Sequence, residues 1–236
     1  MAKTQKVIQL NDIQFSWKSG HPVLTISDLT ITAGEKLFIR GPSGSGKTTL
    51  LGLIGGVLTP DQGSVNISGT DINRLSPAQR DHFRANHIGF IFQMFNLIPY
   101  LSVIENISLP LGFANDRARR INGDTASEAI RLLSAIGLDD KKLIKRPVTE
   151  LSIGQQQRVA AARALIGQPD ILIADEPTSA LDTDTRKTFL ELLFSECDKA
   201  GSTLLFVSHD PTLEAFFDRS IELNVINQAI KGGSQI

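Results

Sequence analysis

The sequence predicts an α/β fold with a mainly parallel β-sheet. Four short apolar runs each end at polar residues, and from Gln155 onward helix and strand patterns alternate along the chain. Runs rich in Ile and Leu are typical of strands buried on both faces of a parallel sheet. Such strands place the groups that follow them at one edge, where open α/β sheets bind ligands. The runs are residues 37–39, 88–92, 171–174 and 204–207.

The first run leads into a glycine-rich loop of the form Gly-x4-Gly-Lys-Thr. Its glycines allow backbone N–H groups to turn inward around phosphates, Lys47 can reach the β and γ oxygens, and the Thr48 hydroxyl can bind Mg²⁺. Residues 49–54 are predicted to form a helix whose N-terminal dipole faces the phosphates. This segment therefore predicts a nucleoside triphosphate site. The loop residues are Gly41, Pro42, Ser43, Gly44, Ser45, Gly46, Lys47 and Thr48.

The third run ends in two adjacent carboxylates, Asp175 and Glu176. A purely structural strand does not need two acids at its end, and burying them unpaired would be costly. We interpret Asp175 as the acid of the Mg²⁺ site, acting through a coordinated water. Glu176 is interpreted as the general base that polarises the attacking water.

The second run ends at Gln93 and the fourth at Ser208-His209. Taken singly, Gln93 is typical of a surface amide and His209 of a loop histidine. Their positions after predicted strands favour catalytic roles, because all four strand ends can then converge on one nucleotide.

A further motif precedes an amphipathic pattern: Leu151-Ser152-Ile153-Gly154-Gln155-Gln156-Gln157-Arg158. Ser152 fits the N-cap of a helix that carries Val159, Ala162 and Ile166 on one face. A capped helix explains these residues, but it does not explain Gly154, which costs helix stability in the first turn. Gly154 therefore indicates a backbone that comes very close to another group.

Together these motifs resemble those of the ATP-binding-cassette (ABC) ATPases over nearly the whole chain. Residues 151–158 resemble the signature sequence of that family. The phosphate loop, Gln93, this signature, the two acids, Ser179-Ala180-Leu181-Asp182 and His209 occur in the family's order. The resemblance implies a RecA-like P-loop NTPase core with an antiparallel β subdomain and an inserted helical subdomain. Lys47, the two acids and His209 are all present, which argues against a cassette that does not hydrolyse ATP.

The resemblance also implies one ABC ATPase domain over residues 1–236. The nucleotide-binding core with its β subdomain is expected in residues 1–93 and 158–236, and the helical subdomain with the signature in residues 94–157. Strand patterns near the N-terminus fit the β subdomain. A helical stretch at residues 125–136 fits the helical one.

In this family an aromatic ring at the end of the first strand stacks on adenine. Trp17 fits that place, with Phe15 as the alternative. ATP would bind residues 41–48 together with Thr49. The resemblance further assigns Mg²⁺ to Thr48, Gln93 and Asp175, and catalysis to Lys47, Gln93, Glu176 and His209.

The signature of this family acts on the ATP that is bound to the other protomer. The resemblance therefore implies a homodimer with two ATP molecules sandwiched between opposing loops and signatures, in which Ser152, Gly154 and the helix N-terminus complete the anion site. Gln155 and Asp182 are the remaining residues assigned to nucleotide binding. A second glycine is usual at Ile153, so this position bears on how tightly the composite site closes.

Residues 93–111 closely resemble the cassettes that serve lipoprotein release, macrolide export and the cell-division permease-like complex. Those ATPases work with integral-membrane permease subunits that transmit motion across the bilayer. The apolar side chains of Phe95, Leu97, Ile98 and Tyr100 are either core or part of a groove that receives a cytoplasmic helix of the permease. Both interpretations stay open at this point.

Composition fits a cytoplasmic protein that reaches the inner membrane only through a partner. The 24 basic and 25 acidic residues balance, so no overall field favours nucleic acid or an anionic membrane. The single cysteine excludes an intrachain disulfide and suits a reducing compartment. No secretory signal or membrane-spanning apolar stretch is expected.

Two other classes of protein fit the sequence less well. A soluble ABC ATPase of DNA repair, chromosome organisation or translation would carry long coiled coils or a second cassette, and neither fits the modest insertion here. The second class is a regulatory module that binds a nucleotide without hydrolysing it. The presence of Glu176 and His209 argues against this class.

Overall fold

The structure is a computed structural model that describes residues 5–18, 20–179, 181 and 183–229. It divides into two compact units, Met1–Arg84 with Leu205–Ile236, and Ala85–Leu204. The chain passes between them within helix α2 (Pro77–His87) and strand β8 (Thr203–Val207). The predicted division into subdomains at residues 93 and 158 stays a prediction.

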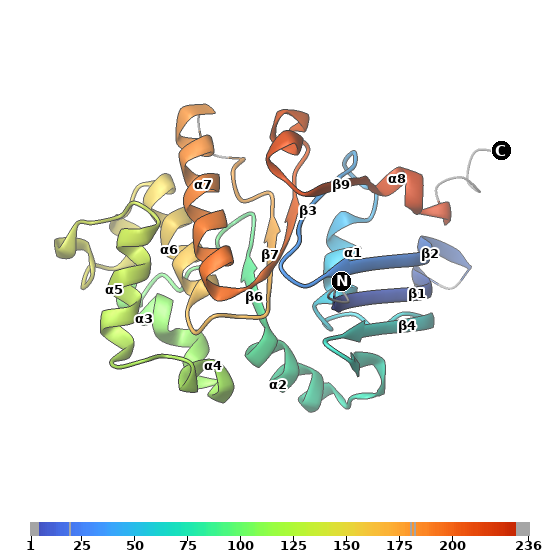
Figure 1. Cartoon of the computed structure of the whole chain (residues 1–236), viewed down its shortest axis with the longest axis horizontal. Coiled ribbons are helices and arrows are strands. Elements are labelled where there is room, and N and C mark those ends of the chain that lie inside the picture. Colours follow the sequence, from blue (N-terminus) through green and yellow to red (C-terminus); the bar gives the residue numbers. More distant parts are fainter. Residues whose placement is uncertain (1–4, 19, 180, 182, 230–236) are drawn as a thin grey trace. The chain divides into compact units, whose positions relative to one another are not determined.

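The first unit contains an antiparallel sheet with the strand order β2-β1-β4-β5 (Figure 1). Ile8, Leu10 and Ile13 of β1 are fully buried, whereas Gln9 is half-buried and Asn11 and Asp12 are exposed, as expected for a sheet with one face in the core. The elements of this unit are β1 (Lys6–Lys18), β2 (His21–Thr32), β3 (Lys36–Arg40), α1 (Lys47–Ile54), β4 (Gln62–Ile67), β5 (Thr70–Asp71), η1 (Ile72–Arg74), η5 (Pro211–Phe216), β9 (Arg219–Glu222) and α8 (Leu223–Ile226).

The same unit contains parallel strands. β3 pairs with β9 in parallel, and on its other side it neighbours β8. The rings of Phe38, Phe206 and Phe217 pack together with centroid separations of 5.0 to 6.2 Å. This aromatic cluster therefore anchors β3 in the core directly before the phosphate loop.

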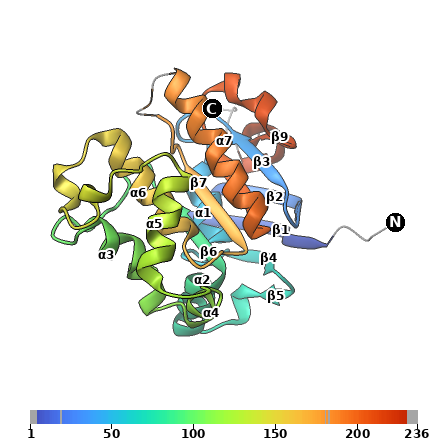
Figure 2. The same cartoon turned by 60° about the vertical axis from the view of Figure 1, so that its left-hand side comes forward.

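The second unit contains helices α3 to α7 together with strands β6 and β7 (Figure 2). Here β6 pairs with β7 in parallel, and α3, α5 and α6 pack against one another. A Cβ on Gly89 of β6 would lie 2.2 Å from the carbonyl oxygen of Ala164, so α6 rests directly on this strand. The elements are β6 (Ile88–Ile91), α3 (Val103–Ser108), η2 (Leu109–Gly112), α4 (Asn115–Arg119), α5 (Thr125–Ala135), η3 (Lys141–Leu143), η4 (Val148–Glu150), α6 (Ile153–Leu165), β7 (Ile171–Asp175) and α7 (Thr183–Ala200).

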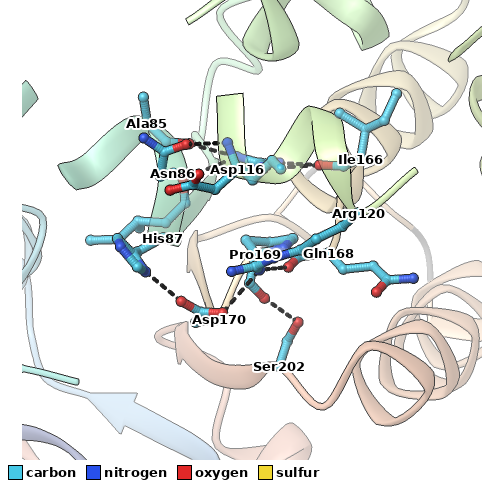
Figure 3. A network of polar contacts seen from close by, with 12 residues as sticks. Ala85, Asn86, His87, Asp116, Arg120, Ile166, Gln168, Pro169, Asp170 and Ser202 are labelled. Atoms are coloured by element: carbon cyan, nitrogen blue, oxygen red, sulfur yellow. Dashed lines mark hydrogen bonds and ion pairs between the residues drawn. The ribbon is translucent and has the colours of Figure 1, made fainter. Parts of the chain in front are cut away.

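A polar network holds the beginning of β7 in the second unit (Figure 3). The Asp170 carboxylate accepts from Arg120 Nη1 at 2.9 Å and lies 2.5 Å from His87 Nδ1. Nearby, the buried guanidinium of Arg117 donates to the carbonyl oxygens of Ala164 and Ile166 at the end of α6, and burial lowers its pKa to about 10. These bonds fix α4, the end of α6 and the start of β7 to one another.

The predicted fold class is confirmed: the fold is α/β, with antiparallel and parallel strands and with helices between the parallel ones. The predicted helix after the phosphate loop is α1, and the predicted helical stretch at residues 125–136 is α5. In the part of the chain that the structure describes, no helix combines the length and the apolar composition needed to cross a membrane.

Candidate nucleotide site

The phosphate loop follows β3 and leads into α1. Gly44 and Gly46 have φ angles of 79° and 96°, a conformation that favours glycine. Lys47 Nζ donates to the carbonyl oxygens of Gly41 at 2.6 Å and Pro42 at 3.0 Å. The ammonium group is therefore held at the loop, and α1 begins there without a side-chain cap, as is common where a helix N-terminus binds an anion.

Gly41 and Ser45 face each other closely inside the loop. A Cβ on Gly41 would lie 2.6 Å from Ser45 Oγ, so a larger residue there would displace the Ser45 hydroxyl. The Ser45 hydroxyl is buried and has no hydrogen-bond partner among the described residues. A buried hydroxyl without a protein partner is suited to a polar ligand that the chain does not supply.

His209 lies at the same edge of the first unit as this loop. The Ser208 N–H group donates to the Ile39 carbonyl oxygen at 3.2 Å, so the ends of β8 and β3 are adjacent. Ser208 and His209 therefore leave β8 where the loop leaves β3. Thr48 in this unit is exposed, and Thr49, in the first turn of α1, is buried.

Trp17 and Phe15 differ in exposure at the end of β1. The indole of Trp17 is 63% exposed, whereas Phe15 is only 6% exposed and meets Trp17 in a T-shaped contact at 5.0 Å. An exposed indole offers an open face to a flat ligand.

In the second unit, Gln93 and the two acids follow neighbouring strands. Ile91 of β6 lies opposite Ala174 of β7 in parallel register, so both strands end at the same edge. Asp175 closes β7, and Glu176 follows it, 9% exposed and with a φ of 48°. Positive φ values at non-glycine residues are uncommon and cluster at functional sites.

The loop after Gln93 is fixed at two points that the sequence did not reveal. Its residues Phe95 and Asn96 have φ angles of 60° and 49°, and their carbonyl oxygens accept from Arg163 of α6 at 2.5 and 2.7 Å. Burial lowers the pKa of Arg163. Further along, the fully buried Asn106 of α3 bonds both the N–H group and the carbonyl oxygen of Ile98, at 2.7 and 3.0 Å. The sequence offered one signal for the contact of Arg163 with this loop, namely a charged residue within the alanine-rich part of α6.

The apolar side chains of this loop are partly exposed. Met94 is 81% and Tyr100 is 83% exposed, whereas Phe95, Leu97 and Ile98 are half-buried. Phe95, Leu97 and Ile98 are therefore partly packed against the rest of the unit, whereas Tyr100 is open to solvent, and a groove for a permease helix stays a prediction.

The signature motif begins α6 as predicted. Ser152 is the N-cap, its Oγ accepts from the Gln155 N–H group, and Gln155 Oε1 accepts from the Ser152 N–H group in a capping box. Ile153 is 60% exposed. A Cβ on Gly154 would meet, among the described residues, only Leu181 Cδ2 at 3.9 Å.

Packing against the described residues therefore does not require a glycine at position 154. The contact between α6 and β6 does not explain the glycine either. That contact is at Ala164, roughly 15 Å along the helix from Gly154. Of the predicted site residues, Asp182 lies outside the described part of the chain.

A phosphate loop between a parallel strand and a helix, with carboxylates at the end of another parallel strand, defines a P-loop nucleoside triphosphatase. The profile of the ABC transporter family matches residues 24–179. The chain belongs to this family and is one of its ATPases. The family predicted from the motifs is thereby confirmed.

Similar proteins include two curated relatives. The lipoprotein-releasing system ATP-binding protein LolD of Bacteroides fragilis is 39% identical over 201 residues, which cover 85% of this chain and 90% of the relative. The macrolide export ATP-binding/permease protein MacB of Rhodopirellula baltica is 38% identical over 92% of this chain, but the matched part is only 32% of that protein.

A solved structure is also similar. It is a dimeric post-hydrolysis state of the ATP-binding cassette MJ0796 bound to ADP and Pi. It aligns with a TM-score of 0.82 and 35% identity, and covers 94% of this chain and 95% of that one.

Proposed function

We propose that this chain is the ATP-hydrolysing subunit of a transporter and powers an integral-membrane permease through ATP-driven dimerisation. The observation that carries the proposal is the beginning of α6. Ser152 and Gly154 form a capped, accessible helix N-terminus, and nothing described in this chain explains the glycine. Such an end is an anion site that is completed by a ligand from outside the chain.

The ligand that fits is the γ-phosphate of ATP bound to a second copy. Two copies would then enclose two ATP molecules, each held by the loop 41–48 of one copy and by Ser152, Gly154 and Gln155 of the other. Trp17 would stack on adenine, since Phe15 is buried. ATP closes this sandwich and hydrolysis opens it, because the bridging phosphate is lost.

Hydrolysis would use the residues predicted from the motifs. Glu176 accepts the proton of the attacking water, and His209 and Gln93 orient the water and the γ-phosphate. Lys47 neutralises charge on the β and γ oxygens. All four would act on the strand-end side of the nucleotide.

The expected metal is Mg²⁺, which neutralises charge on the β and γ oxygens when bound. Thr48, Gln93 and Asp175 would hold it. They offer a hydroxyl, an amide and a carboxylate oxygen, and such hard oxygen donors fit this ion.

The permease would bind at the loop from Gln93 to Tyr100. Relatives named as lipoprotein-releasing and macrolide-exporting ATP-binding proteins support this class of partner. The exposed Met94 and Tyr100 offer apolar surface beside a residue that senses the γ-phosphate. We place the complex at the cytoplasmic face of the inner membrane, with membrane contact through the permease alone and no role for nucleic acid.

Light scattering of the whole chain tests the dimer. The variant Glu176→Gln should be a dimer with ATP and a monomer with ADP, and adding Ser152→Arg should abolish the ATP-dependent dimer. A monomer under both conditions contradicts the proposal. Purification from detergent-solubilised membranes, followed by mass spectrometry of what co-elutes, tests the permease. Recovery without any integral-membrane subunit would favour a soluble ATPase.

A further inference from the structure

The side chain of Asn227, far from the phosphate loop in sequence, reaches it in the first unit. Asn227 follows α8 and is fully buried. Its Nδ2 donates to the carbonyl oxygens of Val23 at 2.9 Å and Ser45 at 3.4 Å. Its Oδ1 accepts from the N–H groups of Thr25 at 2.9 Å and Ala229 at 3.1 Å. These four bonds use both donors and both lone pairs of the amide.

The hydrogen bonds of Asn227 to Val23 and Thr25 take the place of the bonds that a further strand would make at the edge of β2. β2 is an edge strand, and α8 lies beside it (Figure 1). The Val23 carbonyl and the Thr25 N–H group point outward from this edge, and the Asn227 amide pairs with both as a neighbouring backbone would. The amide is thereby held rigidly before it meets the loop.

The bond to Ser45 fixes a peptide plane of the loop. The carbonyl oxygen of Ser45 and the N–H group of Gly46 belong to one planar trans peptide and therefore point in opposite directions. Holding the carbonyl outward against Asn227 turns the Gly46 N–H group to the other side, where the motif binds phosphate.

Neighbouring contacts act in the same sense. A Cβ on Gly46 would lie 2.9 Å from Leu24 Cδ2, so β2 packs against the loop. At the other end of the loop, a Cβ on Gly41 would lie 3.4 Å from Leu223 Cβ. The segment of Leu223 and Asn227 thus supports both ends of the phosphate loop.

We propose that Asn227 is a positioning residue for ATP binding, which orients the phosphate loop by holding the Ser45 carbonyl oxygen against the edge of β2. The inference rests on the proposed ATP site in residues 41–48. Asn227 itself does not touch the nucleotide. Its loss should weaken ATP binding without slowing the chemical step, because the strand-end residues are unchanged.

The test measures steady-state ATPase and the affinity for a fluorescent ATP analogue in the whole chain. Asn227→Ala should raise KM and the dissociation constant about tenfold and leave kcat within about twofold. Amide hydrogen exchange in residues 41–48 should accelerate while that of α5 stays as in the parent. The matched control is Gln228→Ala, because Gln228 bonds Ser27 Oγ of β2 at 3.0 Å, is exposed, and has no described bond to the loop. Its KM should equal that of the parent.

Each outcome decides the matter. An unchanged KM in folded Asn227→Ala overturns the inference. If the melting temperature also falls while exchange in the loop is unchanged, the role of Asn227 is purely structural. If Asn227→Ala does not fold, Asn227→Ser, measured in the same way, decides. A parent protein that fails to bind ATP overturns the proposed function itself, whereas a binding parent with an equally binding variant overturns only the role of Asn227.

Discussion

The guanidinium of Arg163 donates a 2.7 Å hydrogen bond to the carbonyl oxygen of Asn96. Arg163 belongs to α6, the helix that begins with the signature, whereas Asn96 lies three residues after Gln93. The bond therefore ties the signature helix to the loop that we assign to the permease. If the proposed dimer displaces α6 as it closes, this loop would move with the helix.

The first prediction concerns coupling at this loop. Tyr100→Asp should weaken permease binding, because a carboxylate would be desolvated at the contact, and it should leave the melting curve unchanged because Tyr100 is 83% exposed. Leu97→Asp should weaken binding too, with some loss of stability because Leu97 is half-buried. Pull-down and thermal melting are measured together. Phe113→Asp, a change at a 69% exposed ring outside the loop, is the control and should bind normally. Normal partner-stimulated ATPase in both loop variants would exclude a direct coupling role.

The second prediction concerns the catalytic base. Glu176→Gln should bind ATP but hydrolyse it roughly 10²- to 10⁴-fold more slowly, because an amide cannot accept the proton of water. Phosphate release with the permease present is the measurement, and Glu191→Gln, on the exposed face of α7, should hydrolyse at the parent rate. A parental rate in Glu176→Gln would show that another group is the base.

The third prediction concerns the loop cation. Lys47→Ala removes the ammonium that is held at the carbonyl oxygens of Gly41 and Pro42. ATP affinity should fall about 10- to 100-fold, because this is the change expected when one hydrogen bond to a charged group is lost. The fold should be unaffected. Calorimetric titration checks this against Lys187→Ala on α7, where no change is expected. Equal affinity in all three proteins would rule out the assignment of the phosphate loop.

The fourth prediction concerns acid stability. Burial on its own would raise the pKa of Asp170, but the hydrogen bond from His87 and the charge of Arg120 outweigh it and hold that pKa below the ordinary value of 3.8. A lowered pKa in the folded state stabilises the protein above 3.8, and this contribution is lost as the pH falls through the lowered value. Asp170→Asn should therefore be less stable than the parent at pH 7, and the difference should shrink below pH 3.8.

Urea unfolding at several pH values measures this difference. The control is Asp81→Asn, which removes an exposed partner of Arg84 and should give a small difference at every pH. A gap between Asp170→Asn and the parent that stays constant down to pH 3 would contradict the assignment.

The fold elements around the site could be predicted because their signals are local. Leu37, Phe38 and Ile39 are consecutive and fully buried, so the strand before the loop is evident from sequence alone. The reciprocal cap of Ser152 and Gln155 spans only three residues and is equally local.

The supports of the site could not be predicted, because they are long-range bonds to backbone groups. Arg163 reaches Phe95 across 68 positions and Asn227 reaches Thr25 across 202, and a backbone carbonyl or N–H group leaves no mark in a sequence. The choice between Trp17 and Phe15 stayed open for a related reason. The alternation of β1 does not reveal the register shifts after Phe15, beyond which Trp17 is exposed.

Replacing Gly154 by alanine is expected to stabilise the protein and, at the same time, to impair its activity in the cell. A methyl group at this position meets nothing closer than 3.9 Å among the described residues, and a helix gains about 0.5–1 kcal/mol when glycine is replaced by alanine. Gly154→Ala should therefore be enriched in a library sorted only for heat resistance. If the first turn of α6 must approach a phosphate on another copy, the same change should be depleted in cells that depend on the transporter. Engineers who raise the melting point of this protein one residue at a time would thus be led to disable it.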